Sequence, residues 1–290
     1  MLNLLEKHLP KIVMAPTTVA MIVCMYGFIL WTGVLSFTKS GMMPQWELVG
    51  FEQYIRLFDN PRWHVALDNL FIFLFLFIAI SLVLGLLLAI FLDQRIRAEG
   101  AIRTIYLYPM AISFIVTGTA WKWILNPGLG IEKLVRDMGF VDFEFRWLVE
   151  SDMAIYTIVI AAVWQSSGFV MAMFLAGLRG VDDNITKAAK IDGASAIRLY
   201  WHIILPIMRP VFFTAIVILT HIAIKSFDLV QALTGGGPGY SSDLPANFMY
   251  TFAFNRAQMG LGAASAMVML FGVLAVLIPY LYSELRERNT

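Results

Sequence analysis

The side chains with the most chemical character stand in the segment from Ile185 to Pro206, which lies between two long apolar runs. Its charged residues carry both signs and are Lys187, Lys190, Asp192 and Arg198. Ile185, Ala188 and Ala189 recur at helical spacing and form a small apolar face, with the two lysines on another face. A helix of this kind either docks on a partner protein or lies among the headgroups of a membrane.

Local signals divide this segment into two short helices. Asp182 and Asp183 stand where the first helix begins, and carboxylates there complement the positive end of the helix dipole. Gly193 then permits a sharp redirection of the chain. A second amphipathic helix is expected over 195–204, and Pro206 is expected to close it.

A further group of polar residues interrupts a later apolar run. His221, Lys225 and Asp228 are spaced i, i+4, i+7, which places them on one face of a helix. An isolated charge in mid-bilayer costs about 2.5–3.5 kcal/mol, so such residues usually face a cavity or one another. Lys225 and Asp228 therefore form either a structural ion pair or part of a polar wall along a substrate path. Gln165, in an earlier run, either lines the same path or bonds to a neighbouring helix.

The glycine-rich run 234–239 invites comparison with a phosphate-binding loop. Such a loop needs G-x-x-x-x-G-K-[ST] before a helix, whereas this run continues into proline and contains no lysine. It is expected to be either a flexible turn that approaches a partner or a plain break between a span and a loop. The residues concerned are Gly235, Gly236, Gly237 and Pro238.

No catalytic, metal or cofactor site is expected in this chain. The four histidines are scattered singly, without the H-E-x-x-H spacing of a zinc protease. Cys24 is the single cysteine, which excludes an intrachain disulfide and a thiol cluster. The net charge of +1, with no basic arm, gives no indication of a nucleic-acid partner.

The composition predicts an integral membrane protein. Hydrophobic residues make up 59% of the 290 positions and charged residues only 14%, against about 25% charged in soluble domains. Six apolar runs are long enough to cross a bilayer, and they are expected to be helices because a lipid-exposed backbone must satisfy its own hydrogen bonds. The six expected spans are 13–37, 67–92, 104–125, 154–178, 211–233 and 261–282.

The distribution of Lys and Arg predicts which side of the membrane each loop faces. Of the 21 basic residues, 12 lie in the regions 1–11, 93–103, 179–209 and 283–290. These regions are over twice as dense in basic residues as the other loops, so by the positive-inside rule both termini and the 179–209 loop face the cytoplasm. The outer loops are rich in hydrophobic and aromatic residues and are expected to form ordered caps.

Taken together, these residues resemble a known family. The segment Lys187-Ala188-Ala189-x-x-Asp192-Gly193-Ala194, followed by Ile204-Leu205-Pro206, is similar to the EAA motif of binding-protein-dependent ABC importer permeases. Lys187 stands where that motif has a glutamate. Ser226-Phe227-Asp228 and the run 233–239 resemble the fifth span and the following outer loop of carbohydrate permeases. The chain looks most like the glucose or mannose type.

The resemblance implies an all-α type-I importer permease fold, with six transmembrane helices and a cytoplasmic coupling helix. It implies an N-terminal region 1–64, a transport domain 65–285 and a tail 286–290. The 184–206 loop, including Leu205 and Pro206, would couple the permease to an ATPase, so that ATP is used by a partner and not by this chain.

The implied partners lie on both sides of the cell (inner) membrane. They are a second permease subunit, two ATPase subunits, and a soluble sugar-binding protein that contacts the 235–238 loop. The alternative function is a secondary transporter or channel that acts without an ATPase. A secondary transporter should show two similar halves with matching broken helices, which this sequence lacks. A channel would leave the polar 179–209 loop unexplained.

Overall fold

The computed structural model describes residues 2–94 and 96–287, so Met1 and the last three residues of the expected tail 286–290 lie outside it. Apart from one isolated bridge between Thr38 and Leu48, the described residues form helices, turns and loops. The prediction of an all-α protein is confirmed.

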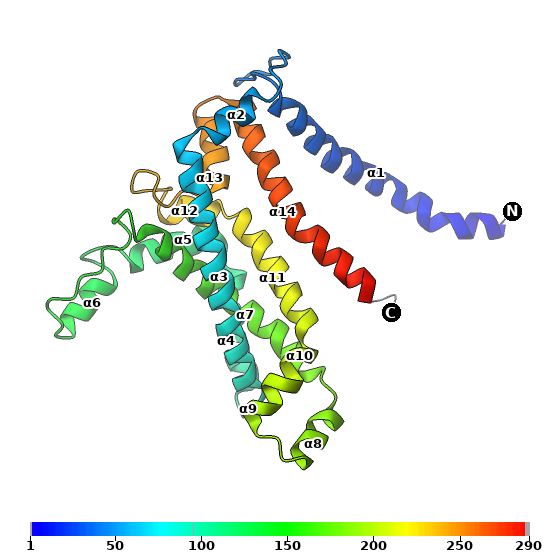
Figure 1. The fold of residues 1–290 in the computed structure, drawn as a ribbon, viewed down its shortest axis with the longest axis vertical. Helices are drawn as coiled ribbons and strands as arrows, with labels where there is room; N and C mark the ends of the chain where they lie inside the picture. Colours follow the sequence, from blue (N-terminus) through cyan, green and yellow to red (C-terminus); the bar gives the residue numbers. More distant parts are fainter. Residues whose placement is uncertain (1, 95, 288–290) are drawn as a thin grey trace. The chain divides into compact units, whose positions relative to one another are not determined.

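The elements are labelled in Figure 1, in which α denotes α-helices and η denotes π-helical turns. In chain order they are α1 (Leu2–Ser36), α2 (Glu52–Phe58), α3 (Pro61–Asp93), α4 (Glu99–Ala111), α5 (Phe114–Ile124), α6 (Ile131–Asp137), α7 (Ala154–Arg179), α8 (Asp183–Ile191), α9 (Ala196–Leu199), η1 (Tyr200–Ile204), α10 (Leu205–Ile207), α11 (Arg209–Ile224), α12 (Asp228–Leu233), α13 (Pro245–Tyr250), η2 (Thr251–Asn255) and α14 (Met259–Glu287).

Four helices of the described chain are long and apolar enough to cross a membrane, and they are α1, α3, α7 and α14. The number rises to six when each of two bent helix pairs is counted as one span, which agrees with the six spans expected from the sequence. The pairs are α4 with α5, bent by 100°, and Ala196–Ile207 with α11, bent by 67°.

Two of the expected spans differ in shape from the sequence prediction. The span over 104–125 is not one straight helix, because Ile112 adopts an extended conformation (ψ 139°) and the chain restarts at the N-cap Ser113. The predicted end of the span over 211–233 is also wrong, because α11 stops at Ile224 and α12 is a separate short helix.

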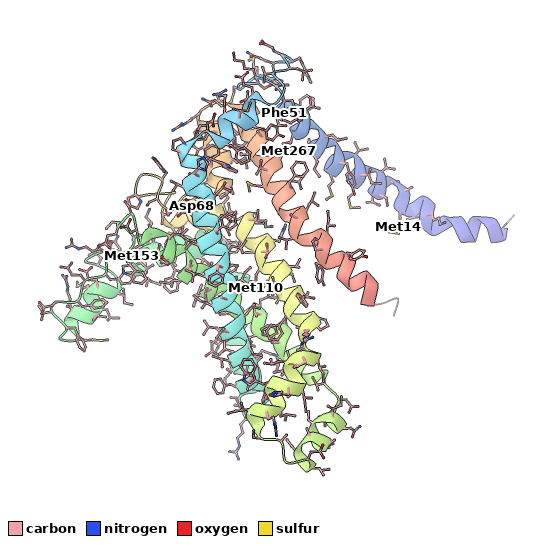
Figure 2. The ribbon with its side chains drawn as sticks, viewed as in Figure 1. Met14, Phe51, Asp68, Met110, Met153 and Met267 are labelled. Atoms are coloured by element: carbon pink, nitrogen blue, oxygen red, sulfur yellow. The ribbon has the colours of Figure 1, made fainter. Side chains whose placement is uncertain are left out.

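The chain forms two compact units, residues 1–60 with 248–270 and residues 61–247 with 271–290. In the first unit, the Gln53 side-chain amide donates to the Thr38 carbonyl at 3.0 Å. The part of α1 that could span a membrane is Val13–Ser36, and none of its most apolar stretch is buried. Figure 2 shows its side chains, Met14 among them, projecting from the helix. Such a helix suits contact with lipid or with another protein.

The second unit is built around α7, of whose most apolar stretch 67% is buried. This helix packs along α3, α4 and α11 (Figure 1). The close approach depends on glycine at two places. A Cβ on Gly85 would lie 2.5 Å from Val170 Cγ1, and one on Gly168 would overlap the Tyr106 carbonyl oxygen.

The loop between α5 and α7 is an ordered cap, as the sequence predicts. Within α6 the carboxylate of Glu132 pairs with Arg136 at 2.9 Å and accepts a hydrogen bond from the Phe145 amide at 3.2 Å. Arg136 Nε donates to the Phe143 carbonyl at 2.7 Å. These bonds hold the chain after α6 against the helix.

Candidate functional site

The first helix of the polar segment, α8, has its sequence-predicted beginning and end. The Asp182 side chain caps it by accepting a hydrogen bond from the Asn184 amide at 2.8 Å. At its end Gly193 has φ +78°, the left-handed conformation that glycine adopts most readily. The Gly193 amide bonds to the Lys190 carbonyl at 3.1 Å and the Ala194 amide to the Ala189 carbonyl at 3.0 Å, which is the Schellman pattern. The redirection predicted at Gly193 is confirmed.

The second helix continues past its expected end. Helical structure runs through α9, η1 and α10 from Ala196 to Ile207, so Pro206 does not close it. The turn before the proline is π-helical, with the Leu205 amide bonded to the Tyr200 carbonyl. This wider turn accommodates a residue that has no N–H to donate. The chain bends at Met208 instead, before α11 begins.

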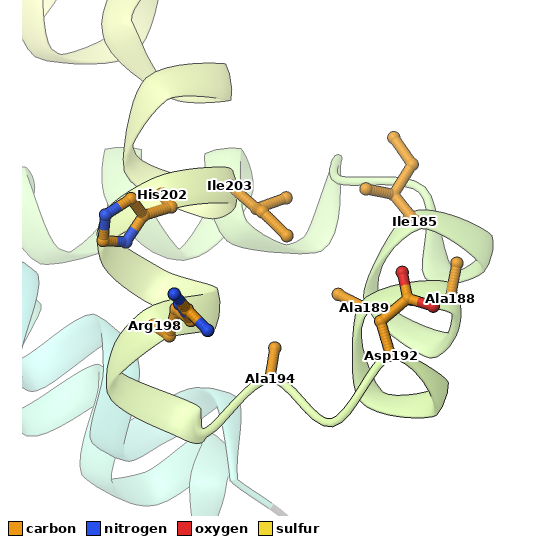
Figure 3. Close-up of a pocket in the computed structure, with 8 residues that line it drawn as sticks. All are labelled: Ile185, Ala188, Ala189, Asp192, Ala194, Arg198, His202 and Ile203. Atoms are coloured by element: carbon orange, nitrogen blue, oxygen red, sulfur yellow. The ribbon is translucent and has the colours of Figure 1, made fainter.

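A recess of about 560 Å³ separates α8 from the second helix, as Figure 3 shows. Its lining residues are Ile185, Ala188, Ala189, Asp192, Ala194, Arg198, His202 and Ile203. In Figure 3 Arg198 and His202 stand on one wall, Asp192 stands on the other, and Ala194 forms the base. The recess therefore has charged walls of opposite sign and an apolar base.

The two alanines of the motif face different surroundings. Ala189 is 7% exposed and packs within its own chain, whereas Ala188 is exposed. Lys187 is exposed and lies 3.8 Å from the carboxylate of Asp183, one helical turn earlier. Asp192 is also exposed, while Leu205 and Pro206 are half-buried. Lys187, Ala188 and Asp192 are thus the motif side chains that are open to a partner.

A cluster of charges at the base of the segment was not anticipated from the sequence. Arg179, the last residue of α7, bonds to Glu99 at the start of α4 at 2.7 Å. Its guanidinium also lies 3.7 Å from Asp93 at the end of α3. Arg179 therefore ties three helix ends together four residues before α8 begins. The sequence does contain a signal for this cluster, because residues of opposite charge stand at the ends of successive spans.

The polar residues of the fifth span do not share one helical face. His221 lies in α11, Lys225 caps its C-terminus, and Asp228 begins α12. The helix ends between them, which breaks the expected i, i+4, i+7 arrangement. The structure describes both Lys225 and Asp228, and it records no ion pair between them. All three side chains are exposed, so they remain open to a path or a neighbouring subunit.

Gln165 bonds to a neighbouring helix and does not line an open path within this chain. Its side chain is 4% exposed, and its Nε2 donates to the Ile112 carbonyl at 2.7 Å. Of the two roles that the sequence leaves open, the geometry corresponds to the interhelical bond. Gln165 thereby joins α7 to the break between α4 and α5.

The glycine-rich run forms a closed, hydrogen-bonded loop. Gly235, Gly236 and Gly239 all have positive φ, and the Gly237–Pro238 peptide bond is cis. The Ser242 hydroxyl bonds to the Gly237 carbonyl at 2.6 Å and to Thr234 Oγ1 at 2.8 Å. The loop is therefore more constrained than the flexible turn that its glycines suggest.

Comparison with known proteins agrees with this architecture. Residues 81–288 match the family described as binding-protein-dependent transport system inner membrane component. A probable ABC transporter permease of Pyrococcus horikoshii is 37% identical over 278 residues, covering 94% of this chain and 95% of the relative. The xylose/arabinose import permease of Haloferax volcanii is 35% identical, with 93% and 86% covered.

Among solved structures, a subunit of a bacterial alginate ABC transporter, in complex with its alginate pentasaccharide-bound periplasmic protein, has the same fold. The TM-score is 0.83 at 17% identity, with 97% of this chain and 95% of that chain covered. The chain therefore has the type-I ABC importer permease fold and belongs to the family of binding-protein-dependent transport system inner membrane components.

Proposed function

We propose that this chain is one of two permease subunits of an ATP-driven sugar importer, and that the α8–α10 segment couples it to an ATPase. One observation carries this proposal: of the nine residues of α8, only Ala189 is buried by the chain itself. Helices shorter than about 12 residues are marginal in water without packing partners. We therefore infer that this short, capped and largely exposed helix packs against another protein.

The charges on α8 suggest the chemistry of that contact. Lys187 replaces the acidic residue of the family motif. Within the described part of the chain, its one ion pair is the 3.8 Å contact with the exposed Asp183. A pair of this kind contributes little stability, so the ammonium remains available to a partner. Lys187 should accordingly face a carboxylate on the ATPase. Asp192, Gly193 and Ala194 fix the direction in which α8 points.

ATP hydrolysis is assigned to the partner, because this sequence has no G-x-x-x-x-G-K-[ST] motif. Two ATPase subunits would bind the paired permeases from the cytoplasm. The density of basic residues supports a cytoplasmic position for both termini and the α8–α10 segment. Closing of the ATPases would move α8 and, through Arg179, the ends of α3 and α4.

The substrate is proposed to be a monosaccharide such as glucose or mannose. Relatives are named for xylose/arabinose and for trehalose/maltose transport, which supports a sugar without selecting one. His221, Lys225 and Asp228 are exposed polar groups on elements of the fifth span, and they are the proposed path residues. Gln165 supports the path indirectly through its bond to the Ile112 carbonyl.

A soluble sugar-binding protein is proposed to deliver the substrate to the outer loop at Gly235–Pro238. The transport domain is proposed to comprise residues 65–285, within which most of the family match falls. A secondary transporter or a channel remains the alternative, and it predicts sugar flux without partners.

Reconstitution into liposomes distinguishes these functions. Uptake of labelled glucose or mannose should require this chain, the second permease, the ATPase, the binding protein and ATP together. Omission of any one should abolish uptake. Sugar flux through liposomes that contain this chain alone would contradict the proposal and favour the secondary transporter.

A further inference from the structure

The outer glycine-rich loop is fastened to the first turns of α3 by a buried ion pair. Arg62 Nε lies 2.7 Å from Asp243 Oδ2, and the two side chains are 19% and 1% exposed. The Asn69 side-chain amide adds hydrogen bonds to the Ser241 carbonyl at 2.8 Å and to the Asp243 carbonyl at 3.0 Å. Three polar contacts thus join segments more than 170 residues apart in the sequence.

The loop itself is closed just before this attachment. The Ser242 amide bonds to the Gly236 carbonyl at 3.1 Å, and its hydroxyl bonds to Thr234 and Gly237. Gly236 has φ +87°, and a Cβ there would lie 2.7 Å from Asp243 Oδ1. The carboxylate therefore occupies the space that any other residue at position 236 would need.

This attachment is a costly way to hold a loop. Asp243 Oδ1 is buried and has no hydrogen-bond partner among the described residues. Burial raises the pKa of Asp243, and the hydrogen bond and charge of Arg62 act in the opposite direction. A well-packed apolar contact would hold the same two segments at equal or lower cost. What the ion pair adds is a directional bond that fixes one geometry.

The part of the loop that precedes this attachment is exposed and can contact solvent or a partner. Tyr240 is 46% exposed, and Gly235 and Gly239 are exposed, while Ser242 and Asp243 are buried. The buried residues therefore hold the loop in place, and the exposed residues are available to a partner.

We propose that Arg62 and Asp243 form an outer latch that presets the shape of loop 234–240 for the soluble sugar-binding protein. The proposal rests on the proposed function, since it assigns that protein as the loop's partner. Both residues are positioning residues, because they act through the loop and do not touch the sugar. A preset loop binds without a further ordering cost, so loss of the latch weakens binding-protein contact and leaves the ATPase cycle intact.

The test uses the assembled transporter in nanodiscs. Its ATPase activity is measured against the concentration of its soluble sugar-binding protein, loaded with glucose or mannose. Arg62→Ala should raise the half-saturating concentration about tenfold, with the maximal rate unchanged. Asp243→Asn leaves the charge of Arg62 without its carboxylate, so it should also raise the half-saturating concentration, but by less than Arg62→Ala because the amide oxygen can still accept from Arg62 Nε. Lys133→Ala is the matched control, because Lys133 is an exposed base of α6 that forms no ion pair with any residue that the structure describes.

Hydrogen exchange of residues 234–243 provides a second measurement that needs no binding protein, and Arg62→Ala should accelerate it. Should Arg62→Ala fail to assemble, the double variant Arg62→Met with Asp243→Leu carries the same test, because it leaves no buried charge unpaired. Unchanged half-saturation and unchanged exchange in the assembled variant would overturn the latch. A wild-type complex that no loaded binding protein stimulates would instead contradict the proposed function, while exchange would still test the latch.

Discussion

Gln165 closes the break in the third span by donating a 2.7 Å hydrogen bond from its side chain to the carbonyl of Ile112. The break leaves helical carbonyls without intrahelical partners, and a buried carbonyl must find another donor. Ser113 caps the following helix by accepting from the Val116 amide at 3.4 Å. The 100° bend between α4 and α5 is thus stabilised from α7.

Gln165→Leu should destabilise the subunit by about 0.5–1.5 kcal/mol, the net contribution of a typical hydrogen bond, because the part-buried Ile112 carbonyl loses its donor. The measurement is the thermal unfolding midpoint of the solubilised complex. Gln94→Ala is the control, because the hydrogen bond of Gln94 to the Ile90 carbonyl is long (3.4 Å) and exposed. Equal midpoints for the two variants would show that the bend does not depend on Gln165.

Gly193→Ala should weaken coupling through the backbone alone. A Cβ at this position meets nothing within 4 Å, so the expected penalty of about 1–2 kcal/mol comes from the left-handed φ of +78°. Gly100→Ala is the matched control, since it too meets nothing and its φ is not in the left-handed region. Uptake per ATP hydrolysed should fall in the first variant and not in the second. An equal ratio in both would contradict a directing role for Gly193.

Ala188→Leu and Ala189→Leu should fail for different reasons. Ala189 is 7% exposed and packs against its own chain, so a larger side chain overpacks the contacts that bury it and costs about 1–3 kcal/mol of stability. Ala188 is exposed, so its variant should fold normally and bind the ATPase less tightly. Unfolding midpoints and co-purification of the ATPase separate the two effects. The reverse pattern would mean that α8 presents Ala189 to the partner.

Lys225→Ala and Asp228→Ala should have additive effects on stability, within about 0.5 kcal/mol, because no ion pair joins the two side chains. A double-mutant cycle on the unfolding free energy measures this. Recovery of stability in the double variant would show that the pair forms in the assembled transporter.

Local features of the fold were predictable because their causes lie within a few residues. The Asp182 cap, the Gly193 turn and the apolar spans each follow from neighbouring residue types. The arrangement at 221–228 was not predictable, since helical spacing has meaning only while the helix continues, and α11 ends at Ile224. Pro206 was misleading for a related reason: a π-helical turn absorbs it.

The contacts that shape the site could not be predicted from neighbouring residues in the sequence. Arg62 and Asp243 are 181 residues apart, and Arg179 and Glu99 are 80 apart. No periodicity connects positions so distant. The burial of Ala189 and exposure of Ala188 also depend on how the second helix folds back beside α8.

The central claim is that α8 docks on an ATPase, and a cysteine at Ala188 tests it most directly. With Cys24 replaced by serine, this cysteine is the single thiol of the chain. In the assembled transporter it should crosslink to the ATPase and do so to different extents with and without ATP. Rapid labelling of that cysteine by a soluble maleimide in the intact complex, unchanged by ATP, would contradict the account.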